Sequence, residues 1–136
     1  MNELFRVTKM SEIAEVLKFR TKQFAVMVIT FCRTLPKDEE FLIIKKQLIR
    51  SATSTAVNYR AVCRARSDAE FFAKLSIVVE EADETLFWLE LINDLGITKN
   101  EQCLNEATEL VKIFSKSRKT VKINSTNNKI NNSVTQ

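Results

Sequence analysis

Apolar side chains recur at spacings of three and four residues in four long stretches of the chain, separated by short polar links. This periodicity places the apolar residues of each stretch on one face of an α-helix. It predicts helices over about residues 11–35, 38–65, 68–95 and 99–121. Four amphipathic helices joined by short links bury their apolar faces against one another, with consecutive helices antiparallel. The sequence therefore predicts an all-α protein, an up-down-up-down antiparallel four-helix bundle.

Residues that start or stop helices lie at the edges of these stretches. Ser11 is a predicted N-cap, and Pro36 stops the first helix because its ring cannot continue the hydrogen-bond ladder. The segments 67–70 (Ser-Asp-Ala-Glu) and 98–101 (Thr-Lys-Asn-Glu) match the capping box of a helix N-terminus. Gly96 stands where the end of a helix favours left-handed backbone. These signals predict tight connections between the helices.

The bundle is predicted to occupy residues 1–121 as a single domain. Residues 122–136 are polar and rich in asparagine, without an apolar period, and we expect this tail to be disordered. The N-terminus lacks the apolar stretch of a signal peptide, and no apolar run approaches the ~20 residues that a membrane span requires. We therefore expect a soluble, cytoplasmic protein without membrane contact.

Two of the predicted helices carry unusual faces. The second half of the second helix, between Ser51 and Asn58, is built largely from small side chains. Small residues let two helix axes approach closely, so a neighbouring helix is expected to pack most tightly there. In the third helix, Phe87, Trp88 and Leu91 lie off the main apolar stripe. They indicate either a wide core face or burial against another subunit.

Composition excludes several classes of function. The chain contains no histidine, so the usual zinc sites, Ser-His-Asp triads and Cys-His dyads are ruled out. It also has no glycine-rich phosphate loop. We predict no catalytic residues, no metal and no cofactor. Cys32, Cys63 and Cys103 form no metal-binding motif, and we expect them to be buried thiols in a reducing compartment.

Charge is distributed unevenly along the chain. The net charge is +4, but residues 67–98 carry one basic and eight acidic groups, while the other segments are basic. Glu80, Glu81, Asp83 and Glu84 resemble the carboxylates of di-metal bundles, but those sites also require histidine. A solvated face, or ion pairs with a neighbouring helix or subunit, is the better explanation.

The predicted topology brings the basic segments together. The start of the first helix, the end of the second, the start of the third and the end of the fourth share one end of the bundle. The helix macrodipole favours basic residues at C-termini, so any single one has a structural explanation. The cluster as a whole is typical of a phosphate-binding surface. The predicted nucleic-acid-binding residues are Arg60, Arg64, Arg66, Lys116, Arg118, Lys119 and Lys122.

Three segments resemble a known family in order and spacing. They are QLIRSATSTAVNYR at 47–60, CRARSDAEFFAKL at 63–75 and EEADETLFWLELINDLG at 80–96. Over roughly residues 10–120 the chain is similar to the 23S rRNA intervening-sequence proteins, four-helix bundle proteins related to the accessory variability protein of diversity-generating retroelements. The resemblance implies a bacterial protein with a left-handed bundle that assembles as a homopentamer around a central channel. It supplies no catalytic residues.

Two functions from different classes are compatible with these features. The leading hypothesis is a non-enzymatic homo-oligomer, expected to be pentameric, that binds the backbone of RNA or DNA through the basic end. The alternative is an oligomeric adaptor or scaffold for another protein, such as a reverse transcriptase, without direct nucleic-acid binding. Few exposed aromatic residues are expected to flank the basic cluster, which argues against a stacking platform for single strands.

Overall fold

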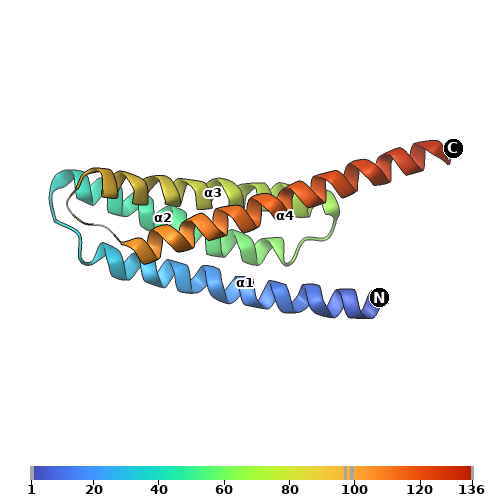
Figure 1. Cartoon of the computed structure of the whole chain (residues 1–136), viewed down its shortest axis with the longest axis horizontal. Coiled ribbons are helices and arrows are strands. Elements are labelled where there is room, and N and C mark those ends of the chain that lie inside the picture. The colour runs from blue at the N-terminus through green and yellow to red at the C-terminus, as the bar shows by residue number, and fades with distance from the viewer. Residues whose placement is uncertain (1, 97, 99, 136) are drawn as a thin grey trace.

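The computed structural model describes residues 2–96, 98 and 100–135. It contains four helices: α1 (Glu3–Cys32), α2 (Glu39–Val62), α3 (Asp68–Asp94) and α4 (Glu101–Val134). Consecutive helices run antiparallel in a four-helix bundle, and no strand occurs in the described part of the chain (Figure 1). The prediction of an all-α bundle is confirmed. The interface between α2 and α3 is the most extensive, and that between α1 and α4 is the least extensive.

The predicted apolar stripes meet in one core along the bundle. Each helix contributes large side chains that solvent does not reach, because the three- and four-residue spacing points them inward. Full burial of one such side chain contributes about 1.5–3 kcal/mol relative to leaving it exposed. The most deeply buried large residues are Phe24, Val28, Phe41, Leu48, Leu75, Val78, Ile92, Leu110 and Phe114.

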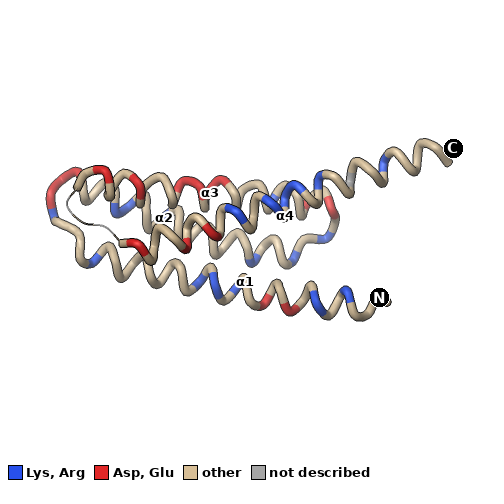
Figure 2. The backbone as a smooth tube through the Cα atoms, in the orientation of Figure 1, with Lys and Arg blue, Asp and Glu red and all other residues tan. Residues whose placement is uncertain are grey.

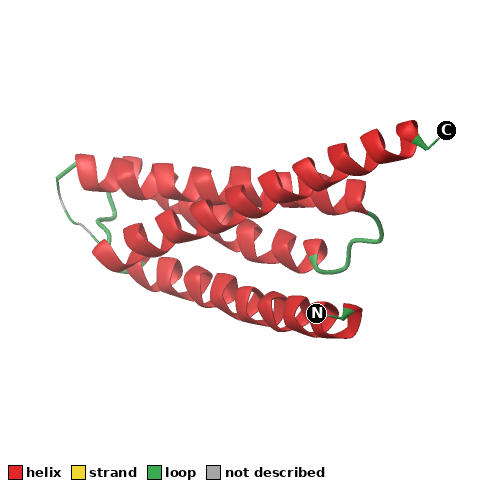
Figure 3. Ribbon diagram, turned by 45° about the vertical axis from the view of Figure 1, so that its right-hand side comes forward, coloured by secondary structure: helices red, strands yellow, loops and turns green. Residues whose placement is uncertain are grey.

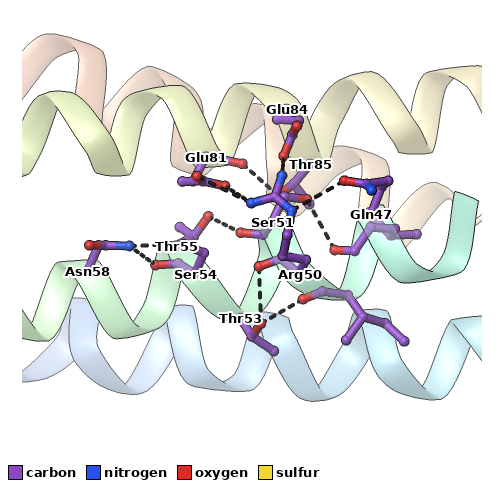
Figure 4. Close-up of polar contacts among 12 residues, drawn as sticks. Gln47, Arg50, Ser51, Thr53, Ser54, Thr55, Asn58, Glu81, Glu84 and Thr85 are labelled. Carbon is purple, nitrogen blue, oxygen red and sulfur yellow. Dashed lines mark hydrogen bonds and ion pairs between the residues drawn. The ribbon is translucent and has the colours of Figure 1, made fainter.

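Several small side chains of α2 are buried inside the bundle. Ser51, Ala52 and Thr55 are completely buried. The Thr55 hydroxyl donates to the Ser51 carbonyl oxygen at 2.8 Å, and the Asn58 amide donates to the Ser54 carbonyl oxygen at 2.8 Å (Figure 4). These bonds within α2 satisfy the polar groups that burial removes from water. Short, satisfied side chains therefore allow α2 and α3 to form their extensive interface.

The signals around α3 act as predicted, and the signal before α4 does not. Ser67 caps α3, and its hydroxyl accepts a hydrogen bond from the Glu70 amide at 3.1 Å. Gly96 has a φ of 73°, the left-handed conformation that glycine adopts without steric cost. The predicted cap at Thr98 is wrong, because the Asn100 side chain accepts from the Cys103 amide at 2.9 Å instead. Asparagine is at least as good an N-cap as threonine.

Both terminal helices are longer than the sequence predicts. α1 begins at Glu3 rather than near Ser11, because the Asn2 side chain accepts from the Phe5 amide at 2.9 Å and caps an earlier turn. α4 continues to Val134, through most of the predicted disordered tail. That tail has no proline or glycine to stop a helix that is already nucleated in the bundle. The start of α1 consequently stands apart from the other helices, and the end of α4 projects past the α2–α3 turn (Figure 1, Figure 3).

The apolar residues off the main stripe of α3 divide into two groups. Trp88 and Leu91 are half-buried and pack against the core, which supports the wide core face. Phe87 is 53% exposed and meets the Trp88 ring edge-on, with ring centroids 5.0 Å apart. Phe87 is therefore the most exposed of the three and the best placed for contact with another subunit.

The prediction of buried cysteines is confirmed at two positions and wrong at the third. Cys32 and Cys103 are buried in the core, whereas Cys63, just after α2, is exposed. Burial raises the pKa of the Cys32 thiol to about 11 and that of the Cys103 thiol to about 11. Because the thiolate is the reactive form, both buried thiols are inert near neutral pH.

We expect a thiol reagent such as DTNB to label the folded chain once, at Cys63, and the unfolded chain three times. Exposure allows Cys63 to react, while the core excludes the reagent from Cys32 and Cys103. The measurement is the absorbance of the released thiolate with and without denaturant, and Cys63→Ser serves as the control without a labelled site. Rapid labelling of more than one thiol in the folded protein would contradict the buried positions.

Candidate nucleic-acid interface

Charged residues give the bundle two ends of opposite sign. Figure 2 shows Lys and Arg gathered where the start of α1, the α2–α3 turn and the later part of α4 lie. Asp and Glu gather at the other end, where Asp38 precedes α2, Asp94 ends α3 and Glu101 begins α4. The antiparallel topology produces this division, because it places segments of like charge at the same end. We call the first of these the basic end.

The end of α2 and the turn that follows it present three guanidinium groups, Arg60, Arg64 and Arg66, which we call the turn cluster. Arg60 lies in the last turn of α2, where the unpaired carbonyl groups of the helix favour a cation. All three residues are exposed. Arg66 Nε lies 3.9 Å from Glu70 Oε2, but the Arg66 side chain is 90% exposed, so this ion pair contributes little. The turn cluster is therefore accessible to an anionic partner.

The second basic group, which we call the α4 cluster, comprises Lys116, Arg118, Lys119 and Lys122. All of these except Lys116 line a hollow of about 590 Å³ between α3 and α4. The sequence analysis missed Phe72, which forms part of the opposite wall of this hollow. The predicted topology could have identified Phe72, because it pairs the start of α3 with the later part of α4. Phe72 is half-buried, so the prediction that few exposed aromatic residues flank the basic cluster still holds.

Most of the predicted binding residues form no ion pair within the described part of the chain, although Glu80 lines the same hollow as Arg118, Lys119 and Lys122. Among the described residues, no carboxylate oxygen lies within 4.0 Å of a cationic nitrogen of the α4 cluster, nor of Arg60 or Arg64. The acidic α3 is neutralised elsewhere, since Arg50 Nη1 lies 3.2 Å from Glu81 Oε2 and Arg50 Nη2 pairs with Glu84 (Figure 4). This confirms the ion-pair interpretation for two of the four α3 carboxylates. Most cations of the basic end are therefore without an ion-pair partner among the described residues.

An apolar cavity of about 500 Å³ lies between the first half of α1, the end of α2, the start of α3 and the middle of α4. Phe71, Leu75 and Phe114 line it, together with Tyr59, whose ring centroid is 5.2 Å from that of Phe114. Burial raises the pKa of the Tyr59 phenol above its usual range, so this side chain is neutral. Within the described ranges, no group of three or more Cys, Asp or Glu side chains is placed to hold a metal ion. In the same ranges, no helix is both long and apolar enough to cross a membrane.

The outer face of α1 and α2 exposes large apolar side chains. Phe19 is 67% exposed and Val57 is 65% exposed, and both line a hollow of about 410 Å³ together with Arg60. Val26 on α1 and Ile43 on α2 are also more than half exposed. Exposed apolar residues that gather on one face are typical of protein–protein interfaces. This face is therefore a candidate surface for contact with another chain.

Comparisons with known proteins identify relatives of this bundle. The family model described as 23S rRNA-intervening sequence protein matches residues 15–116. A solved relative is the crystal structure of a protein with unknown function from the S23 ribosomal protein family of Bacteroides thetaiotaomicron. It is 33% identical, with a TM-score of 0.69, and the match covers 78% of this chain and 97% of that chain. No curated protein matches the sequence. The range matched by the family model contains the turn cluster and ends before Arg118.

Proposed function

The chain belongs to the 23S rRNA-intervening sequence protein family, and from this premise we propose that it is a non-enzymatic, homo-oligomeric bundle that binds the backbone of RNA or DNA through its basic end. The observation that carries the proposal is that the turn cluster and the α4 cluster lie at one end of the bundle and that most of their cations have no ion-pair partner among the described residues. Cations without carboxylate partners can replace the counterions of a phosphate backbone, and the release of those counterions drives binding.

In this proposal the basic side chains contact phosphate oxygens rather than base edges. Guanidinium groups such as those of the turn cluster form bidentate hydrogen bonds with phosphate, and the lysines of the α4 cluster add point charges. Phe72, beside the α4 cluster, offers a ring on which one unpaired base can stack. The basic end on its own therefore supplies affinity that depends strongly on salt and weakly on sequence.

Assembly of several copies strengthens the same site. We propose that copies contact one another through the outer face of α1 and α2, where Phe19 and Val57 are exposed. The family resemblance implies five copies in a ring. If the basic ends lie on one side of that ring, their electrostatic potentials add and attract a polyanion from a larger distance.

The proposed function is tested by measuring the mass of the protein in solution by light scattering after size exclusion. The measurement is made at low and at high salt, with and without a generic structured RNA. We expect a stable oligomer in every condition and an RNA complex at low salt only. Six to ten phosphate contacts correspond to a loss of affinity of about 10³–10⁵-fold between about 50 and 200 mM salt. Affinity that is independent of salt would contradict the phosphate contacts. A monomer would contradict the proposed assembly.

A second candidate function is an oligomeric adaptor or scaffold for another protein, such as an accessory to a reverse transcriptase. The observation that favours it is the exposed apolar surface on α1 and α2, which suits a protein contact better than a nucleic-acid contact. An oligomer that ignores RNA at every salt concentration but co-elutes with a purified reverse transcriptase would support this alternative.

A further inference from the structure

The last part of α4 is an arm that no other helix covers. Residues 122–134, which we call the arm, continue α4 past the α2–α3 turn (Figure 1). Every side chain described in this range is exposed. The arm lies beyond residues 15–116, the range that the family model matches. Its role is therefore a property of this chain rather than a requirement of the family fold.

The helical conformation gathers the asparagines of the arm on one face. Their positions follow the i, i+3, i+4, i+7, i+8 spacing of a single helical face. Asparagine is a poor helix former, so helix stability does not explain this row. The Thr126 and Ser133 hydroxyls donate to backbone carbonyls of the arm, whereas none of these amide side chains has a hydrogen-bond partner among the described residues. The five residues are Asn124, Asn127, Asn128, Asn131 and Asn132.

The charges around this asparagine face are all of one sign. Residues 110–136 contain six Lys or Arg residues and no Asp or Glu. Lys122 and Lys129 are seven residues apart and share one side of the arm, which lies closer to Thr126 and Ser133 than to the middle of the asparagine face. A row of amides on a helix whose charges are all positive suits an anionic ligand that also presents hydrogen-bonding groups, as nucleic acid does.

We propose that the arm is a recognition helix that enters the major groove of double-stranded DNA, with its asparagine face toward the base edges. The inference rests on the proposed function, because the turn cluster and the α4 cluster supply the backbone contacts that position the arm. An asparagine side chain pairs with adenine through two hydrogen bonds. Its Nδ2 donates to adenine N7, and its Oδ1 accepts from the adenine N6 amino group. The arm therefore favours duplexes that contain A·T pairs.

Groove dimensions select DNA over RNA. A helix with its side chains is about 10–12 Å across, and the major groove of B-DNA is about 12 Å wide. The major groove of an A-form RNA duplex is deep and narrow, and side chains cannot read it. The 13 residues of the arm span about 20 Å, which is enough to follow one stretch of groove. An arm that reads base edges thus distinguishes two duplexes that the basic end binds alike.

Fluorescence anisotropy with the full-length protein tests this inference on three duplexes. They are an A·T-rich DNA, a DNA of G·C pairs only, and an RNA with the sequence of the first. We expect the A·T-rich DNA to bind at least about tenfold more tightly than either of the others. Asn128→Ala/Asn131→Ala is expected to lose this preference and to keep salt-dependent binding. Alanine favours helix more than asparagine does, so a weaker helix cannot explain the loss.

The matched control is Thr126→Ala/Ser133→Ala on the opposite face of the arm, which is expected to keep the preference. Equal affinity for RNA and A·T-rich DNA would overturn the inference and leave the proposed function standing. The same holds for a preference that survives in Asn128→Ala/Asn131→Ala. If the unaltered protein binds none of the three duplexes at low salt, the proposed function and this inference fail together.

Discussion

Replacing Arg60, Arg64 and Arg66 together by glutamate is expected to weaken nucleic-acid binding by about 10³-fold while the bundle stays folded. A hydrogen bond to a charged group contributes about 1.5–3 kcal/mol, and the triple variant removes three donors and turns three anions toward the phosphates. The effect on stability is small, because all three residues are exposed and, among the described residues, Arg66 alone of the three has an ion-pair partner. Anisotropy at fixed low salt measures the affinity, and circular dichroism verifies the fold.

The matched control reverses three exposed basic residues near the other end of the bundle, Arg33→Glu/Lys37→Glu/Lys46→Glu. It changes the net charge by the same amount. The comparison therefore distinguishes the effect of where the charges lie from the effect of the total net charge on affinity. When both variants are compared at about 0.1 M salt, we expect the control to lose far less affinity, because screening then limits the reach of exposed charges to about 10 Å. Equal losses in the two variants would contradict a localised binding surface. Changed assembly in the turn-cluster variant would favour the adaptor function.

The largest effect on stability is expected for Phe114→Ala. Phe114 is 1% exposed and packs against Tyr59, with ring centroids 5.2 Å apart. Removing a buried phenylalanine ring costs about 3–5 kcal/mol, through lost burial and the cavity that remains. We expect the lower part of this range, because Phe114 borders the apolar cavity beside α1 and its neighbours have room to relax. Urea denaturation followed by circular dichroism measures the change in unfolding free energy.

The same substitution at Phe87 is the control for this measurement. Phe87 is 53% exposed, so Phe87→Ala removes much less buried surface and is expected to cost about 1 kcal/mol or less. Equal losses in the two variants would contradict the buried position of Phe114. If the cost of Phe87→Ala rises with protein concentration, Phe87 contributes to a contact between copies, because assembly stabilises the folded state by mass action.

The helices and their buried faces could be predicted from the sequence because both depend on local periodicity. Leu48 and Phe41 lie on the same stripe whether or not the neighbouring helices are known, and both are completely buried. The cap at Ser67 and the left-handed Gly96 are equally local, and the structure contains both. The ends of α1 and α4 are different, because a helix nucleated in a bundle can continue through a segment that would not form one alone. Asn2 and the arm were missed for this reason.

Topology and sequence together were enough to place the turn cluster and the α4 cluster at one end of the bundle. The sequence by itself determined which residues are basic, which faces are apolar and how the helices alternate in direction. Only the tertiary structure decided that Arg118 faces Phe72 across a hollow, and that Arg50 neutralises Glu81 and Glu84. Contacts between helices depend on the axial offset and rotation of each helix, and these result from the packing of all the core side chains at once.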